Sequence, residues 1–120
     1  MNFYWIANMA GTIDGNSKLK VIHLNVGTIF ETTHYTLSKA GEFFQSILEG
    51  TTEIAKDNNG RIFIDRDPEV FKILLDFLRS DYLIIPEGMS QKVLIESNYY
   101  KMQLISPSKG NVAVVAFEEQ

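Results

Sequence analysis

The sequence predicts an α+β domain, in which short strands and amphipathic helices follow one another along the chain. Two segments near the start, 20–26 and 29–33, alternate apolar and polar residues as strands do. A later segment, 67–79, has the apolar spacing and the capping residues of a helix. The chain has 120 residues, of which 45% are hydrophobic, and this suits one domain with one core.

The first strand, 20–26, separates its side chains onto two faces. His23 lies on the polar face, and Gly27 and Thr28 then provide a turn. The second strand, 29–33, is therefore expected to pair with the first as a hairpin. The apolar face of the first strand comprises Ile22, Leu24 and Val26.

A helix is predicted after this hairpin. Ser38 suits its N-cap position, and Gly50 ends it. The polar, turn-rich segment 51–60 then leads to a third short strand, 61–65. The apolar residues at helical spacing are Phe43, Phe44, Ile47 and Leu48.

The helix at 67–79 carries several agreeing signals. Asp67 can accept hydrogen bonds from the free N–H groups of the first turn, and Pro68 suits the first helical position. Glu69 complements the positive end of the helix dipole. The predicted core face contains Phe71, Leu74, Leu75 and Leu78.

The last third of the chain predicts shorter elements. Residues 81–85 are extended, Ser90 begins a helix, and Asn98 begins a final short helix. An added strand is predicted at 112–117. We divide the chain into a flexible lead at 1–18, a folded domain at 19–106 and a C-terminal tail at 107–120.

Composition excludes several classes of function. The chain has no cysteine, which rules out disulfides and zinc–thiolate sites. Its formal net charge is -4 and it has no dense run of Lys or Arg, so nucleic acid is not expected as the main partner. No apolar run approaches the roughly 20 residues of a membrane helix, so no membrane insertion is expected. We expect a cytoplasmic protein, with the nucleus as the alternative.

Catalytic and metal-binding patterns are missing from the sequence. His23 and His34 stand in or beside strands, and a two-histidine metal site would require them to converge with a carboxylate. We interpret His23 as a residue of the polar face of its strand. Gly27 has no companions of a phosphate-binding loop, and no serine lies in a nucleophile elbow. We therefore predict no catalytic residue, no metal and no cofactor, and we interpret the chain as a binding domain rather than an enzyme.

The cluster Asp65, Arg66 and Asp67 is the one concentration of charge beside apolar sequence. It can be an interface between subunits, a purely structural cap with a local ion pair, or, least in keeping with its surroundings, an acid–base pair. Phe71, in the first turns of the next helix, can be an aromatic anchor for a partner if it lies at an exposed rim. The other aromatic residues on apolar faces are expected to pack in the core.

Taken together, residues 20–105 resemble the BTB/POZ domain of the potassium-channel tetramerisation (T1) and KCTD type. The stretch from FIDRDP to FLRS is the most specific part of this resemblance. The other segments that carry it are VIHLNVG (21–27), FETT (30–33) with 36–37, and LIESNYY (94–100) with 104–105.

The resemblance implies a three-stranded sheet with a cluster of about four to five helices, and self-assembly into closed rings, commonly tetramers or pentamers. Many KCTD-like members recruit the ubiquitin-ligase scaffold cullin-3, whereas T1 members set subunit choice in potassium channels. Many channel domains also bind zinc through a His and Cys set. The lack of cysteine favours the KCTD-like branch, with a channel-assembly domain and a dimeric BTB domain of a transcriptional regulator as alternatives.

Two sets of candidate residues follow from this resemblance. In one respect the chain departs from the family, because one residue is missing before the second strand, at Gly27 and Thr28. The predicted subunit interface comprises Asn25, Phe30, Thr32, Asp65, Arg66, Asp67, Asp76 and Arg79. The predicted cullin-3 contact comprises Phe71, Glu49, Glu53 and Ile54.

Overall fold

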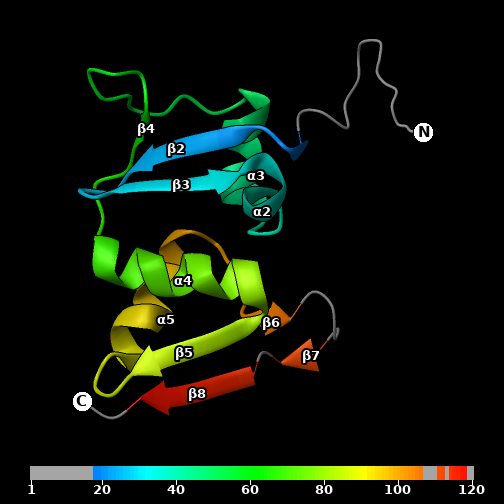
Figure 1. Cartoon of the computed structure of the whole chain (residues 1–120), viewed down its shortest axis with the longest axis vertical. Helices are drawn as coiled ribbons and strands as arrows, with labels where there is room; N and C mark the ends of the chain where they lie inside the picture. The colour runs from blue at the N-terminus through cyan, green and yellow to red at the C-terminus, as the bar shows by residue number, and fades with distance from the viewer. Residues whose placement is uncertain (1–17, 107–110, 113, 119–120) are drawn as a thin grey trace.

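The computed structural model describes residues 18–106, 111–112 and 114–118. Within them a three-stranded sheet lies at one end of the molecule, and helix α4 separates it from a second layer at the other end (Figure 1). The predicted α+β class and the three-stranded sheet are confirmed, and the described residues contain four helices. The predicted flexible lead lies outside the described residues, apart from Lys18.

Strands β2 (Val21–Asn25) and β3 (Ile29–Thr33) form the predicted antiparallel hairpin. Gly27 adopts a φ of +88°, a left-handed conformation that favours glycine, and its N–H donates to the Asn25 Oδ1 at 3.0 Å. The Val26 N–H donates to the Thr28 carbonyl at 3.0 Å, which closes the turn. His23 is exposed on the polar face, and Leu24 is buried on the other face, as predicted.

The third strand, β4 (Ile62–Phe63), is shorter than predicted and pairs in parallel with the second half of β2. Its register places Leu24 opposite Ile62. The chain reaches β4 through a tight turn built on Asp57. The Asp57 Oδ1 accepts from the backbone N–H groups of Asn59 and Arg61, both at 2.9 Å.

Two helices stand where one was predicted: α2 (His34–Ser38) and α3 (Glu42–Glu49). Ser38 ends α2, so its prediction as an N-cap is wrong. The preceding threonine provides a better cap, since the Thr33 Oγ1 accepts from the Thr36 N–H at 3.1 Å. Gly41 separates the helices with a φ of +110°, and Gly50 ends α3 in the left-handed conformation, as predicted.

Helix α4 (Pro68–Ser80) begins as the sequence predicts. The Asp67 Oδ1 accepts from the Glu69 N–H at 2.9 Å, and Pro68 occupies the first helical position. The helix is buried on most of its circumference, which explains why its apolar surface is wider than a single stripe. Its buried residues are Val70, Phe71, Leu74, Leu75, Phe77 and Leu78.

Beyond α4 the chain forms β5 (Tyr82–Pro86) and α5 (Ser90–Tyr99). The final helix predicted from Asn98 is absent from the described chain, because Asn98 lies inside α5. The helix ends at a turn in which the Met102 N–H donates to the Ser97 carbonyl and Lys101 adopts a φ of 54°. Asn98 was therefore predicted wrongly as a helix start.

The remaining described strands are β6 (Ile105–Ser106), β7 (Asn111–Val112) and β8 (Val114–Glu118). β6 and β7 are antiparallel, whereas β8 returns alongside β5 in parallel over five residue pairs. Figure 1 shows this second sheet on the far side of α4 from β2 and β3. Helix α4 consequently has sheet structure on both sides.

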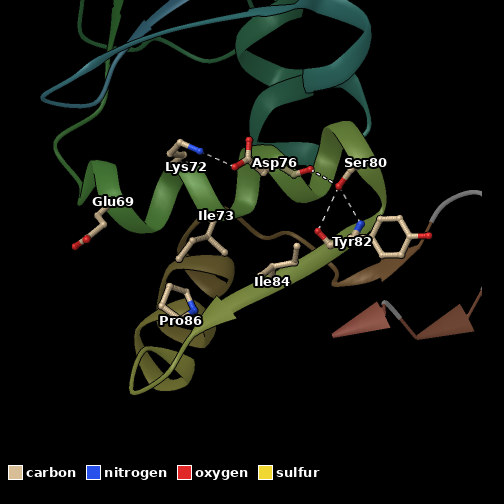
Figure 2. A pocket seen from close by; sticks show the side chains of 8 residues that line it. All are labelled: Glu69, Lys72, Ile73, Asp76, Ser80, Tyr82, Ile84 and Pro86. Atoms are coloured by element: carbon tan, nitrogen blue, oxygen red, sulfur yellow. Dashed lines mark hydrogen bonds and ion pairs between the residues drawn. The ribbon is translucent and has the colours of Figure 1, made fainter. Parts of the chain in front are cut away.

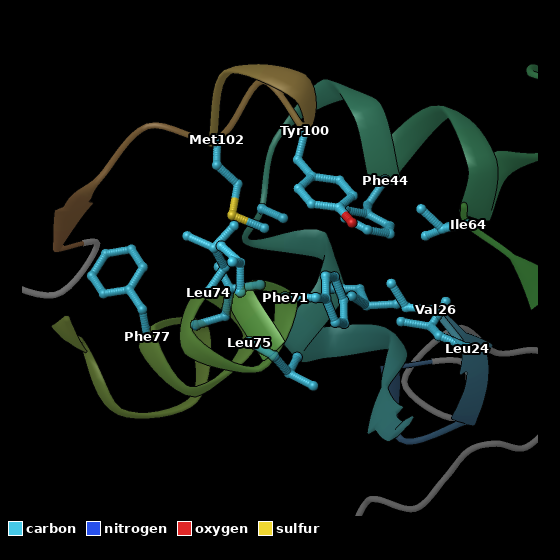
Figure 3. Close-up of a cluster of buried hydrophobic side chains, with 14 of the residues drawn as sticks. Leu24, Val26, Phe44, Ile64, Phe71, Leu74, Leu75, Phe77, Tyr100 and Met102 are labelled. Atoms are coloured by element: carbon cyan, nitrogen blue, oxygen red, sulfur yellow. The ribbon is translucent and has the colours of Figure 1, made fainter. Parts of the chain in front are cut away.

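The core gathers around Phe71, which is 0% exposed (Figure 3). Its ring meets Phe30 of β3 at 5.2 Å, Phe44 of α3 at 6.2 Å and Tyr100 at 5.4 Å, measured between ring centroids. Tyr100 is also fully buried, and its hydroxyl has no hydrogen-bond partner. Burial raises the pKa of this phenol far above its ordinary value. The aromatic cluster therefore joins β3 to α3, to α4 and to Tyr100, which directly follows α5.

Candidate interaction surfaces

The corner between β4 and α4 is tied to α5 by a charged pair. The Arg66 Nε donates to the Glu96 Oε1 at 3.0 Å, and the Arg66 Nη2 donates to the Glu96 Oε2 at 2.5 Å. The guanidinium also lies 4.1 Å from the centre of the Tyr99 ring. Glu96 is 8% exposed, and its hydrogen bonds raise the pKa of Arg66. We call this arrangement of Arg66, Glu96 and Tyr99 the α5 clasp.

The α5 clasp leaves fewer groups of the predicted interface corner, Asp65, Arg66 and Asp67, available to another subunit. Arg66 is directed to a partner in its own chain, and Asp67 is occupied as the cap of α4. Asp65 remains exposed. Sequence reasoning missed Glu96, which lies 30 residues from Arg66 and has no local pattern that marks it. Tyr99 was expected in the core and is 41% exposed, because it forms the outer face of this clasp.

A second charged surface joins the outer side of α4 to β3. The Arg79 Nη2 donates to the Glu31 carbonyl at 2.6 Å, which attaches the end of the helix to the strand. Asp76 accepts from Lys72 at 2.8 Å and from Arg79 at 3.4 Å. The side chains of Asp76 and Arg79 keep 46% and 43% of their surface exposed. We call the exposed surface of Glu31, Lys72, Asp76 and Arg79 the β3–α4 face.

Two predicted interface residues lie beneath this face rather than on it. Thr32 is 8% exposed, and Phe30 is half-buried against the ring of Phe71. They support the position of β3 and leave the charged groups of α4 at the surface. The structure therefore joins Asp76 and Arg79 to the hairpin, whereas Arg66 belongs to the α5 clasp.

Asn25 has its own partner across the sheet. Its Nδ2 donates to the Asp57 Oδ2 at 2.9 Å, and the Arg61 Nε donates to the same oxygen at 3.0 Å. The hydrogen bond from Asn25 is the largest cause that lowers the pKa of Asp57 to about 2, and the bonds from Arg61 and Asn59 act in the same direction. Asn25 thus anchors the turn before β4.

Phe71 lies in the core, as its helical spacing predicts, and not at the exposed rim that its alternative role as a partner anchor requires. The side chain is 0% exposed, because the aromatic cluster from β3, α3 and Tyr100 surrounds it. Among the other cullin candidates, Glu49 and Glu53 are exposed and Ile54 is half-buried. Glu53 and Ile54 line a shallow hollow of about 370 Å³ below the end of α3. This loop, unlike Phe71, is accessible.

A groove of about 310 Å³ lies between α4 and β5 (Figure 2). Its walls combine Ile73 from the helix with Tyr82 and Ile84 from the strand. Tyr82 is 50% exposed and Ile84 is 44% exposed. Sequence reasoning did not single out this groove, since the alternation of β5 is too short to distinguish an exposed apolar face from a buried one.

Catalytic and metal-binding arrangements do not emerge from the described part of the chain. Among those residues, no three His, Asp or Glu side chains come close enough to hold a metal ion. None of the helices in the described ranges has the length and apolar character needed to cross a membrane. The surfaces described above consist of ion pairs, a shallow hollow and an apolar groove, which are features of binding.

A three-stranded sheet packed against a cluster of helices through one central helix is the architecture that BTB/POZ domains use. Residues 22–107 match the family model described as the BTB/POZ domain. The chain belongs to the BTB/POZ family. The resemblance found in the sequence is therefore confirmed, and the relatives below place the chain with the KCTD type.

Several relatives share about two thirds of the chain. The BTB/POZ domain-containing adapter for CUL3-mediated RhoA degradation protein 1 of Danio rerio is 38% identical over 87 residues, which are 70% of this chain and 26% of that protein. The SH3KBP1-binding protein 1 of Bos taurus is 45% identical over 84 residues, 68% of this chain and 12% of that protein. The BTB/POZ domain-containing protein KCTD3 of Homo sapiens is 42% identical over 84 residues, 68% of this chain and 10% of that protein. The match thus spans about a quarter or less of each relative.

Proposed function

We propose that this chain is a homo-oligomeric, KCTD-like adaptor domain that acts by binding and recruits cullin-3. The observation that carries self-assembly is the β3–α4 face. Arg79 fastens α4 to β3, so charged groups from two elements form one continuous exposed surface. Opposite charges placed side by side favour a partner with the complementary arrangement and a fixed orientation.

The proposed assembly is a closed ring in which the β3–α4 face of one copy meets the next copy. A ring requires a contact between two different patches, since a self-complementary patch gives a dimer. Asp65 remains a candidate for the second patch, because it is exposed beside the α5 clasp. We propose four or five subunits, as the resemblance to T1 and KCTD domains implies.

The mass of the assembly tests this proposal. Light scattering after size-exclusion chromatography is expected to give four or five chains for the wild type. Arg79→Glu reverses a charge on the β3–α4 face and should shift the mass towards one chain. Lys92→Glu, an exposed position on α5, makes the same charge change elsewhere and should leave the mass unchanged. A wild-type monomer at high concentration contradicts the proposal, and a dimer would favour the transcriptional-regulator alternative.

Cullin-3 recruitment is supported by the name of one relative, which describes an adapter for CUL3-mediated RhoA degradation. The proposed contact is the loop after α3, with Glu49, Glu53 and Ile54, and no longer includes the buried Phe71. Ile54, half-buried beside the exposed Glu53, combines an apolar anchor with a charged rim.

Calorimetry with the N-terminal domain of cullin-3 tests this second part. Ile54→Ala combined with Glu53→Lys should weaken binding at least tenfold. Glu87→Lys combined with Lys92→Ala changes exposed residues of the second layer and should have little effect. Equal binding by wild type and loop variant contradicts the assignment of the loop, and the ring mass can be measured on the same samples independently.

A further inference from the structure

A groove of about 280 Å³ lies beside the first half of β2. The turn at 56–61 forms its opposite wall. Neither the predicted subunit interface nor the cullin candidates explain this groove. The residues that matter for its chemistry are Lys20, Val21, His23, Lys56, Arg61 and Ile62.

The backbone of β2 is open to this groove. The Asn25 carbonyl accepts from the Ile64 N–H on the β4 side, whereas the Lys20 carbonyl accepts from the His34 N–H on the β3 side, both at 2.9 Å. Because peptide groups alternate sides along a strand, Val21 faces the same side as Asn25. β4 pairs only with Leu24 and Asn25, so the edge at Val21 has no partner strand among the described residues. An open strand edge of this kind can accept an added strand.

The rim of the groove has unbalanced positive charge. Arg61 pairs with Asp57 at 3.0 Å and His23 with Glu31 at 2.8 Å, so these two groups have acidic partners in the chain. Lys20 and Lys56 are both exposed and form no ion pair with any described residue. Two ammonium groups that lack an acidic partner among the described residues therefore lie beside one strand edge, in a chain whose net charge is -4.

Apolar side chains lie on both faces of the sheet beside this groove. Val21 is 52% exposed on the outer face, whereas Ile62 is half-buried on the core face, where it lies opposite Leu24. Lys20 and Lys56 belong to the core face too, because Lys20 alternates with Val21 and Lys56 bridges Ile62. A strand alternates its side chains, so one set can reach the lysines while the other covers Val21. Double-stranded nucleic acid is too wide for such a groove. Single-stranded nucleic acid has no peptide backbone with which to pair with the edge of β2.

We propose that this groove binds an extended acidic segment of a partner protein, which adds to the open edge of β2. Its backbone would pair with Val21, its carboxylates would meet Lys20 and Lys56, and its alternate apolar residues would cover Val21. The proposal does not depend on ring assembly or on cullin-3, because none of these three residues belongs to the surfaces invoked for those functions.

Fluorescence anisotropy with the full chain tests this proposal. The probe is a labelled eight-residue peptide of alternating glutamate and valine. Binding is expected to weaken at least tenfold when glutamine replaces every glutamate, and to weaken as salt rises from 50 to 500 mM. A peptide with proline at two central positions should also lose at least tenfold, since proline cannot donate the backbone hydrogen bonds of a strand.

Charge reversal locates the site. Lys20→Glu with Lys56→Glu should weaken peptide binding at least tenfold. The matched control, Lys92→Glu with Lys101→Glu, makes the same charge change at exposed positions away from the groove and should change binding by less than twofold. Circular dichroism is expected to be unchanged for both variants, because all four side chains are exposed.

Several results would overturn the proposal. They are a lack of binding at millimolar peptide, equal losses in the two double variants, and undiminished binding of the proline peptide. Tighter binding of an eight-nucleotide single-stranded DNA than of the peptide would also overturn it, since the groove would then recognise phosphates. Chemical-shift changes at Val21 and Ile62 that accompany binding of the peptide would support strand addition.

Discussion

The α5 clasp and the β3–α4 face use the same residue types in opposite ways. In the clasp, Arg66 meets a carboxylate that is 8% exposed, with bidentate geometry and an aromatic ring beside the guanidinium. On the β3–α4 face, Arg79 and Asp76 keep more than two fifths of their side chains in water and meet at 3.4 Å. Removing one partner of a buried pair leaves an unpaired charge, whereas an exposed pair contributes little to stability. Loss of one clasp partner is therefore expected to destabilise the fold, whereas the face is the surface that we propose for binding.

Phe71 contacts Phe30 of β3 and Tyr100 directly after α5, so its loss should disturb both regions. Phe71→Ala removes a fully buried ring that contacts β3, α3 and Tyr100, and is expected to cost about 3–5 kcal/mol. Urea unfolding followed by circular dichroism measures this loss. Tyr99→Ala, which truncates an exposed ring, serves as the control and should cost clearly less. A cost below about 1 kcal/mol for Phe71→Ala would contradict its central position.

The clasp is expected to respond asymmetrically to its two truncations. Arg66→Ala leaves the carboxylate of Glu96 buried and should cost about 2–3 kcal/mol, somewhat less than a fully enclosed pair. Glu96→Ala leaves Arg66, whose side chain is 30% exposed and can be hydrated, so a cost of about 1–2 kcal/mol is expected. Equal unfolding midpoints in urea for wild type and Arg66→Ala would show that the pair does not hold α5.

Asp57, like Glu96, accepts hydrogen bonds from partners within its own chain, and its contribution to stability depends on pH. Its pKa is lowered to about 2 in the folded chain, below its ordinary value of 3.8. Its contribution to stability is therefore complete above about pH 4 and is lost as the pH falls towards 2. Asp57→Asn should remove this component, so the wild-type and variant thermal midpoints should converge between pH 4 and 2. Parallel midpoint curves across that range would contradict the assignment.

The β3–α4 face should give the smallest change in stability. Asp76→Ala removes an exposed carboxylate from Lys72 and Arg79 and is expected to cost about 0.5 kcal/mol or less. The same variant should alter the assembled mass if the face forms the proposed interface. Urea unfolding measures the change in stability, and light scattering measures the assembled mass. A large loss of stability would show that Asp76 supports the fold itself.

Features of the fold that depend on residues close together in the sequence could be predicted. Asp67, Pro68 and the apolar spacing of α4 act within a few residues of one another, and the helix begins where they indicate. The two strands of the hairpin were likewise predicted from alternation and turn residues. Ser38 was misplaced because Thr33 provides the cap, and local preferences do not rank two such candidates. Asn98 was misplaced because α5 continues through it.

The surfaces were harder to predict because they depend on contacts between distant segments. Nothing near Arg66 in the sequence indicates that Glu96 will be its partner, 30 residues later. Phe71 has the spacing of a core residue, but its complete enclosure depends on rings from three other elements. The groove beside β2 exists because β4 is too short to cover the whole of β2. The strand predicted from the sequence, 61–65, was longer than β4.

The buried hydroxyl of Tyr100 allows the opening of the core to be followed by absorbance. An exposed phenol ionises near pH 10 and absorbs more strongly near 295 nm as it does so. Burial raises the pKa of Tyr100 well beyond that value, so its proton is released only when the aromatic cluster opens. During an alkaline titration, a late step in absorbance would therefore mark the opening of the core. Tyr100→Phe would remove that step and leave the signal of the other tyrosines unchanged.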